Sequence, residues 1–367
     1  MSVSDDTSVN RSAAIGAKPK AVIFVPGFST LTADQALDQM LLNSIRIEYT
    51  AEITSEAPTS CGGLAGRRIT FGPARSVDFF EVYWLGSIER LSKAPAVLRL
   101  WLGLVTTLWF IRPRTWPGLA RSRGWLVPLI GNSITFVLWL ATTLATVLVA
   151  VGQVASWFPS NHVVDSIHRL TSVVNGPFVL ALTAVLTYWS VDANQLVDIS
   201  YVVNRYLRNR LDRDGFTLNQ KSAALIEGAL LKVIRSGEYD HVTIAGHSFG
   251  GMLAVDSLGA QPAKLPAANL HLVTLGSFFD LLVEEKPEVL VRLRNCASNA
   301  RIEKWDDFWS LDDGFSSARP VLSKTTFPLY DRHEAHIPSI AAYDGGGHAS
   351  YFSDPAVLRS ILESNPG

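Results

Sequence analysis

The chain is poor in charged residues and has no excess of either sign. Asp, Glu, Lys and Arg make up 18% of its 367 residues, against about 25% in an average soluble domain. Lys and Arg number 32 and Asp and Glu number 33, so the formal net charge is -1. Nucleic-acid-binding proteins usually need a basic surface, and this balance supplies none. Hydrophobic residues make up 48%, which excludes a disordered or fibrous protein and favours contact with a membrane.

Cysteine is nearly absent. The two cysteines, Cys61 and Cys296, are too few for a disulfide framework or a four-thiolate zinc site, and they favour a reducing compartment. Residues 1–19 also lack the basic start and the apolar stretch of a secretory signal, since they are polar and carry Asp5 and Asp6. We therefore expect residues 1–19 to be a disordered leader.

Charge is wholly absent from the middle of the chain, because no Asp, Glu, Lys or Arg occurs from residue 124 to residue 164. Within it, residues 126–152 would form a helix of roughly 40 Å, longer than a hydrocarbon core of about 30 Å. A second charge-free run ends at Val191. We predict two transmembrane helices, at about 126–152 and 173–191. The alternative is an apolar helical cap or lid packed on a soluble core.

The basic residues around these two runs predict their orientation. The connection at about 153–172 offers only Arg169, whereas arginines are frequent before the first run and after the second: Arg112, Arg114, Arg121, Arg123, Arg205, Arg208 and Arg210. Cytoplasmic flanks of transmembrane helices are enriched in basic residues. We therefore expect both long flanks on the cytoplasmic side and the short connection on the other side.

Outside the apolar middle, β-branched runs alternate with helical patterns. Strands are predicted at residues 21–25, 77–85, 241–245, 270–275 and 301–309, and helices at 218–234, 252–258 and 355–362. This alternation predicts an α/β fold whose mostly parallel sheet is covered by helices on both faces. The expected parts are 20–93 and 192–367, which form the α/β domain, and 94–191, an apolar helical insertion.

The most informative motif is Gly246-His247-Ser248-Phe249-Gly250-Gly251, between a predicted strand and a predicted helix. In that setting the pattern is typical of a nucleophile elbow, in which a serine lies on a sharp turn. Gly246 and Gly250 leave room where the strand and helix backbones come too close for a Cβ. The N–H of the serine and that of the next residue are expected at a helix N-terminus, where N–H groups point toward an incoming anion. His247 is expected to point away from the serine.

With this motif in place, the chain resembles the α/β-hydrolase family, and within it the lipase-like and esterase-like members. The similarity covers about residues 20–90 and 192–365. It rests on Phe24-Val25-Pro26-Gly27-Phe28, on the motif around Ser248, and on residues 305–314 with 347–355. Pro26 stands where the family has a histidine, which matters little because the family's donor in this loop is a backbone N–H.

The resemblance implies a Ser-His-Asp triad in the family's chain order. Ser248 would be the nucleophile, and His348 would be the general base that takes its proton. An aspartate would orient the imidazole, most simply Asp313. The backbone N–H groups of Phe28 and Phe249 would form the oxyanion hole. Such a reaction needs neither a metal nor an organic cofactor.

The acid has more than one candidate. The aspartates that crowd near the predicted last strand are Asp306, Asp307, Asp312 and Asp313. The first two fall inside that strand, and the last two fall in the turn after it, where the acid is expected. The family's usual spacing favours Asp313, with Asp312 a close alternative and Asp280 a more distant one. His336 is the alternative to His348.

The strand that leads to Phe28 lies before the apolar insertion, and the motif around Ser248 lies after it. Both must join one sheet on the same side of the bilayer, so the number of spans between them must be even. Two spans fit, and residues 94–111 are then expected to be interfacial or buried. The sequence predicts a multi-pass membrane-anchored serine hydrolase with a cytoplasmic catalytic domain, whose partners are the lipid bilayer and a small-molecule or lipid ester. The alternatives are an acyltransferase or thioesterase on the same fold, or a non-catalytic membrane scaffold.

Overall fold

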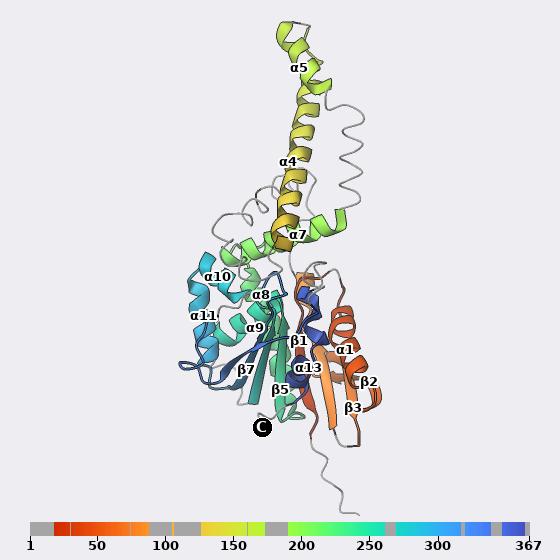
Figure 1. Ribbon diagram of the computed structural model, residues 1–367, viewed down its shortest axis with the longest axis vertical. Coiled ribbons are helices and arrows are strands. Elements are labelled where there is room, and N and C mark those ends of the chain that lie inside the picture. Colours follow the sequence, from red (N-terminus) through yellow and green to blue (C-terminus); the bar gives the residue numbers. More distant parts are fainter. Residues whose placement is uncertain are drawn as a thin grey trace, which may run out of the picture.

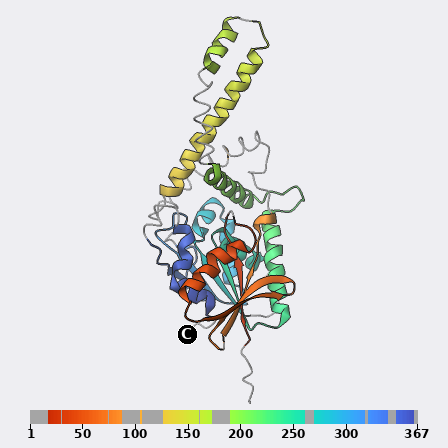
Figure 2. The same ribbon diagram turned by 90° about the vertical axis from the view of Figure 1, so that its right-hand side faces the viewer.

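The computed structural model describes residues 18–29, 31–73, 75–87, 105, 126–159, 161–172, 190–260, 269–316, 320–338 and 347–363. It consists of an α/β body and a long helix, α4 (Leu126–Ala155), which rises from one end of that body (Figure 1). The short helix α5 (His162–Ser172) packs at the far end of α4. Helix α7 (Ser190–Leu207) lies across the end of the body from which α4 rises, beside the lower end of α4 (Figures 1 and 2).

The body is built on an eight-stranded sheet with the order β2-β3-β4-β1-β5-β6-β7-β8. Every pair from β4 to β8 is parallel, and the β2–β3 and β3–β4 pairs are antiparallel. The predicted mostly parallel sheet is therefore confirmed. The strands are β1 (Lys20–Val25), β2 (Ile53–Cys61), β3 (Leu64–Phe71), β4 (Arg75–Glu81), β5 (His241–His247), β6 (Asn269–Leu275), β7 (Ile302–Trp309) and β8 (Tyr330–Glu334).

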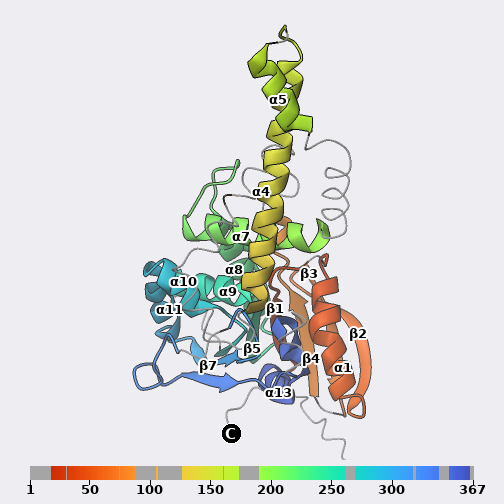
Figure 3. The same cartoon turned by 45° about the horizontal axis from the view of Figure 1, so that its top comes forward.

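Both faces of the sheet are apolar because its central strands alternate two sets of buried side chains. In β1, Ile23 belongs to one core and Val22 and Phe24 to the other. The first core is completed by α8 (Leu218–Ser236), α9 (Phe249–Ala260), α10 (Phe279–Glu285) and α11 (Glu288–Ala297). The second is completed by η1 (Leu37–Leu42), α1 (Asn43–Glu48), η5 (Gly347–Ser353) and α13 (Pro355–Leu362). Helices on both faces were predicted, and Figure 3 shows α9 and α1 on opposite sides of the sheet.

Local signals explain where two of these helices begin and end. Thr217 and Gln220 form a capping box at the start of α8, and Gly237 ends that helix with φ 66°, which glycine adopts without strain. The carboxylate of Asp354 accepts a hydrogen bond from the Ala356 N–H at 2.8 Å, with Pro355 at the first position of α13.

Three strands escaped the sequence analysis, and one was predicted too long. The strand expected at 77–85 ends at Glu81; residues 82–84 are irregular, and Leu85 begins the helical turn η2 (Leu85–Ser87). Strands β2 and β3 form an edge hairpin in which most side chains of β2 are exposed and most of those of β3 are half-buried or exposed, and β8 consists of titratable residues throughout. Neither pattern has the buried apolar alternation on which the predictions relied.

The first predicted span is a helix in the structure. In the part of the chain that is described, one segment, Phe136–Ala155, is long and apolar enough to cross a bilayer. The second predicted span lies outside the described residues except for its last two, which begin α7. The apolar segment at 94–111, apart from Val105, and the expected leader, apart from Lys18 and Pro19, also lie outside them.

Candidate active site

Ser248 lies on a strained turn between β5 and α9. Its φ is 57°, a left-handed conformation that costs a non-glycine residue about 1–3 kcal/mol. The Ser248 N–H donates to the Leu275 carbonyl at 2.7 Å, which ties the turn to the neighbouring strand β6. A Cβ on Gly246 would lie 2.6 Å from Gly251 Cα, and one on Gly250 would lie 2.2 Å from the Val25 carbonyl oxygen. Both glycines are therefore required where the sequence analysis expected them.

The structure brings Ser248, His348 and Asp313 together from three separate segments. Ser248 Oγ lies 2.6 Å from His348 Nε2, and His348 Nδ1 lies 2.9 and 3.0 Å from the two carboxylate oxygens of Asp313. With the proton on Nδ1, His348 donates to Asp313 and Nε2 accepts the Ser248 proton. This geometry allows the serine hydroxyl to be deprotonated by the imidazole while the carboxylate stabilises the resulting imidazolium.

Asp313 is fully buried and yet remains well supplied with donors. Its Oδ1 accepts the Phe315 N–H at 2.9 Å, and its Oδ2 accepts the Tyr351 hydroxyl at 2.8 Å. Burial alone would raise the pKa of Asp313, but the charge of His348 and the hydrogen bonds from His348, Phe315 and Tyr351 outweigh it and lower the pKa. The carboxylate is therefore ionised at neutral pH.

The other acidic candidates have different surroundings. Asp306 and Asp307 lie inside β7, as expected. Asp306 accepts hydrogen bonds from His271 and His333. Asp307 accepts hydrogen bonds from Thr274 and Tyr330. Asp312 is half-buried next to Asp313, and Asp280 is buried in α10. The alternative histidine, His336, donates its backbone N–H to the Asp354 carboxylate at 2.6 Å. Asp313, which the sequence analysis favoured over Asp312 and Asp280, is the aspartate at His348 Nδ1.

His247 has a position that the sequence did not reveal. From the sequence, His247 was expected to point away from Ser248 and was assigned no role. In the structure its ring centroid lies 5.1 Å from that of His348. Its Nε2–H donates to the His348 carbonyl oxygen at 2.7 Å. Burial, and then the charge of His348, lowers the pKa of His247 to about 3, so the ring is neutral. His247 thus holds the backbone of the loop that carries His348.

The segment Pro26-Gly27-Phe28, here called the oxyanion segment, lies against Ser248. A Cβ on Gly27 would be 2.6 Å from Ser248 Cβ and 3.1 Å from Ser248 Oγ. The Phe28 and Phe249 rings lie 5.4 Å apart, and Phe249 begins α9. The first N–H groups of a helix have no intrahelical acceptor. The two residues expected to supply backbone donors therefore lie on the two segments that meet at Ser248.

Three supporting residues were missed by the sequence analysis. Tyr351 binds Asp313, and the Phe315 ring lies 5.2 Å from the His348 ring. Trp84 donates its indole N–H to the Pro26 carbonyl oxygen at 2.7 Å. Tyr351 follows His348 by three residues in a block that was already singled out, so proximity could have indicated it. Trp84 had no such signal because it lay within a predicted strand.

No metal ligands are assembled in the described part of the chain, where no three His, Cys, Asp or Glu side chains form a group that could hold an ion. Cys61 and Cys296 are both buried and free. Comparison of the chain with protein-family models, with curated proteins and with solved structures found no match. The arrangement around Ser248 is therefore interpreted from its own geometry.

Proposed function

We propose that this protein is a membrane-anchored serine hydrolase of the α/β-hydrolase type that cleaves carboxylic esters through an acyl-enzyme. The observation that carries the proposal is the continuous hydrogen-bonded line from Ser248 Oγ through His348 to Asp313. A buried, ionised carboxylate, an imidazole and a hydroxyl on a strained turn have the chemistry that acyl transfer needs.

In the proposed reaction, Ser248 Oγ attacks the carbonyl carbon of the ester while His348 Nε2 takes the hydroxyl proton. The backbone N–H groups of Phe28 and Phe249 stabilise the negative charge that develops on the carbonyl oxygen. The Nε2 proton then passes to the departing alkoxide, which leaves Ser248 acylated. A water molecule, deprotonated by the same imidazole, releases the acid and restores the serine.

The placement of these residues on the sheet supports an α/β-hydrolase. The oxyanion segment follows β1, Ser248 follows β5, Asp313 follows β7, and His348 follows β8. These strands are parallel, so all four groups lie at the same edge of the sheet, where open α/β sheets bind their ligands. The chain order of serine, aspartate and histidine is the order of that family.

The position of α4 supports a membrane anchor and a lipid-like ester. Tyr206 of α7 contacts Phe249 at a ring-centroid distance of 5.0 Å, and α7 lies at the same end of the body as the lower end of α4 (Figures 1 and 2). The candidate active site therefore lies at the end of the body from which α4 rises. Along α4 large apolar side chains are exposed, among them Val137, Leu144 and Val151. Such a surface suits hydrocarbon better than water.

Turnover of a short p-nitrophenyl ester tests the catalytic proposal. Ser248→Ala should abolish hydrolysis, because it removes the hydroxyl that is paired with His348 Nε2 and that forms the proposed acyl-enzyme. Ser257→Ala is the matched control, since Ser257 is a buried serine of the helix that follows Ser248, and we expect it to retain activity. Equal turnover by Ser248→Ala and wild type would reject the proposal. Addition of an alcohol or thiol acceptor would show whether the acyl group is transferred as well as hydrolysed.

Carbonate extraction of membranes tests the anchor. Leu144 lies near the middle of α4 and its side chain is exposed, as is Val291 in α11. An arginine at the centre of a spanning helix costs about 2.5–3.5 kcal/mol, so Leu144→Arg should increase extraction. Val291→Arg should behave like wild type. Release of the wild-type protein into the soluble fraction would contradict the anchor.

A further inference from the structure

We infer that Trp84 is a positioning residue for the reaction proposed above, on which this inference rests. It holds the oxyanion segment in register with Ser248, although it lies 58 residues from Pro26 along the chain. Trp84 follows β4 and comes just before η2, where the chain leaves the sheet toward the apolar middle.

Trp84 contacts the oxyanion segment through both its polar and its apolar atoms. Its side chain is fully buried, and its Nε1–H donates to the Pro26 carbonyl oxygen at 2.7 Å. Its ring lies 5.2 Å from the Phe28 ring and 5.5 Å from the Phe249 ring. One side chain therefore contacts both residues whose N–H groups are proposed to bind the oxyanion.

The oxyanion segment has little room to move. A Cβ on Gly250 would lie 2.5 Å from the Pro26 carbonyl oxygen, and one on Gly27 would lie 2.6 Å from Ser248 Cβ. The Pro26 carbonyl is thus held between α9 on one side and the Trp84 indole on the other. The Pro26 carbonyl belongs to the peptide group just before the one that carries the Phe28 N–H, so fixing it constrains that N–H through the backbone of Gly27. Displacing donors by about 1 Å can cost about a hundredfold in rate.

The residue before Trp84 supports the other end of the same loop. The Tyr83 hydroxyl donates to the Leu31 carbonyl oxygen at 3.2 Å. Tyr83 and Trp84 thus bind carbonyl groups on both sides of Phe28. Two consecutive aromatic residues with this arrangement constrain the backbone around the proposed donor.

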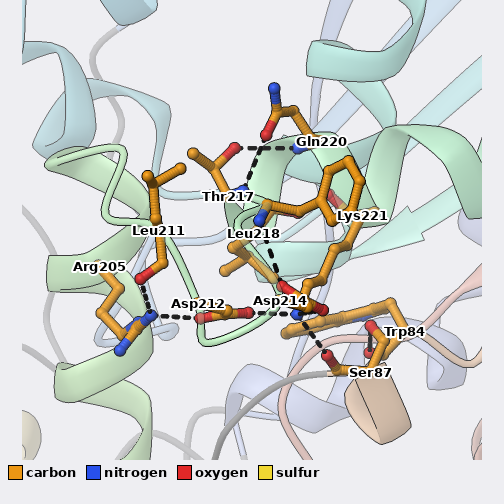
Figure 4. Close-up of polar contacts among 12 residues, drawn as sticks. Trp84, Ser87, Arg205, Leu211, Asp212, Asp214, Thr217, Leu218, Gln220 and Lys221 are labelled. Atoms are coloured by element: carbon orange, nitrogen blue, oxygen red, sulfur yellow. Dashed lines mark hydrogen bonds and ion pairs between the residues drawn. The ribbon is translucent and has the colours of Figure 1, made fainter.

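Trp84 is itself fixed to the helices that follow the apolar middle (Figure 4). The Ser87 hydroxyl donates to the Trp84 carbonyl at 2.6 Å, and Lys221 Nζ donates to the Ser87 carbonyl at 3.5 Å. Lys221 of α8 also pairs with Asp212 at 2.6 Å, and Asp212 pairs with Arg205 of α7. The turn after β4, α7 and α8 are therefore joined beside the oxyanion segment.

Steady-state kinetics of Trp84→Phe with a p-nitrophenyl ester tests the inference. The variant keeps an aromatic ring but removes the indole N–H. Loss of one oxyanion donor typically costs about 10²–10³ in rate, and a displaced donor should cost less, so we expect kcat to fall by about 10- to 100-fold. KM should stay within about twofold, because the oxyanion is bound only in the transition state.

Trp305→Phe is the matched control, because Trp305 is also buried and donates its indole N–H to Thr274 Oγ1 at 2.9 Å, away from the oxyanion segment. We expect its kcat to stay within about threefold of wild type. If both variants lose kcat equally, or if Trp84→Phe changes only KM, the inference is wrong. Should Trp84→Phe fail to fold, β-(3-benzothienyl)alanine at position 84 removes the N–H while keeping the shape, and the same fall in kcat is expected.

The two proposals fail in different ways. If wild-type turnover persists in Ser248→Ala, the proposed function itself is wrong. If turnover depends on Ser248 but Trp84→Phe retains the wild-type kcat, the proposed function stands and the role of Trp84 is rejected.

Discussion

Replacing Asp313 with asparagine should lower turnover by about four orders of magnitude without unfolding the protein. The substitution keeps the size of the side chain and removes its charge. In the structure Asp313 accepts the Phe315 N–H on Oδ1, the Tyr351 hydroxyl on Oδ2, and His348 Nδ1–H on both oxygens. An amide has only one oxygen to offer these donors.

The size of the expected loss in turnover depends on which donor the single amide oxygen of the asparagine accepts from. The Phe315 N–H is part of the backbone and cannot turn away, so the asparagine oxygen should face it and the amide NH₂ should face His348. A donor opposite Nδ1 favours the tautomer with its proton on Nε2, and that nitrogen can no longer accept the Ser248 proton. A wrong tautomer of this kind costs about 10⁴ in kcat, or about 5.5 kcal/mol of transition-state stabilisation.

Turnover of a p-nitrophenyl ester, measured alongside unfolding in guanidinium chloride, checks this prediction. Asp312→Asn is the control, since Asp312 is the half-buried neighbour that was the close alternative to Asp313 in the sequence. We expect it to retain turnover within about threefold. The reasoning would be refuted if Asp313→Asn kept turnover within about tenfold of wild type at unchanged stability, or if Asp312→Asn showed the larger loss.

Two further predictions concern stability. Gly250→Ala should lower the free energy of unfolding by about 3 kcal/mol, because its Cβ would lie 2.2 Å from the Val25 carbonyl oxygen. In Gly228→Ala the new Cβ meets no atom within 4 Å, and the variant should stabilise α8 by about 0.5–1 kcal/mol. Chemical denaturation compares the two variants, and equal effects on stability would contradict the close packing at Gly250. The hydrogen bond with Asp306 raises the pKa of His333. The pair of protonated His333 and Asp306 therefore stabilises the folded protein fully below about pH 6.5, and this contribution is lost as the pH rises through the raised pKa. The difference in unfolding free energy between wild type and His333→Gln should therefore shrink from pH 6 to pH 8. We expect a change of only about 0.5 kcal/mol, because His333 is half-exposed and solvent weakens the interaction. A difference that increases over this pH range would contradict the prediction.

The residues around Ser248 could be predicted because their constraints are local. A serine on a strand-to-helix turn needs small neighbours where the backbones of the strand and the helix come close. Gly246 and Gly250 meet this requirement and are visible in the sequence. The long helix α4 could be predicted for a similar reason, because a charge-free apolar run of that length is typical of a membrane-spanning helix.

The partners of Ser248 were harder to predict because they depend on long-range geometry. Chain order and resemblance favoured Asp313 as the acid but kept Asp312 and Asp280 as alternatives, and the hydrogen bonds to His348 Nδ1 depend on the three-dimensional path of the turn after β7. The role of Trp84 depends on a hydrogen bond between segments that follow two different strands. The contact of His247 could not be predicted because it involves the loop that carries His348, about a hundred residues further along the chain.

Mass spectrometry of the protein after treatment with a fluorophosphonate shows whether Ser248 is the activated nucleophile. The reagent phosphonylates a serine only when a neighbouring base activates its hydroxyl. We expect a single adduct on the peptide containing Ser248, and loss of that adduct in His348→Ala because Ser248 Oγ lies 2.6 Å from His348 Nε2. An adduct on another residue, or labelling of Ser248 that persists in His348→Ala, would contradict this expectation.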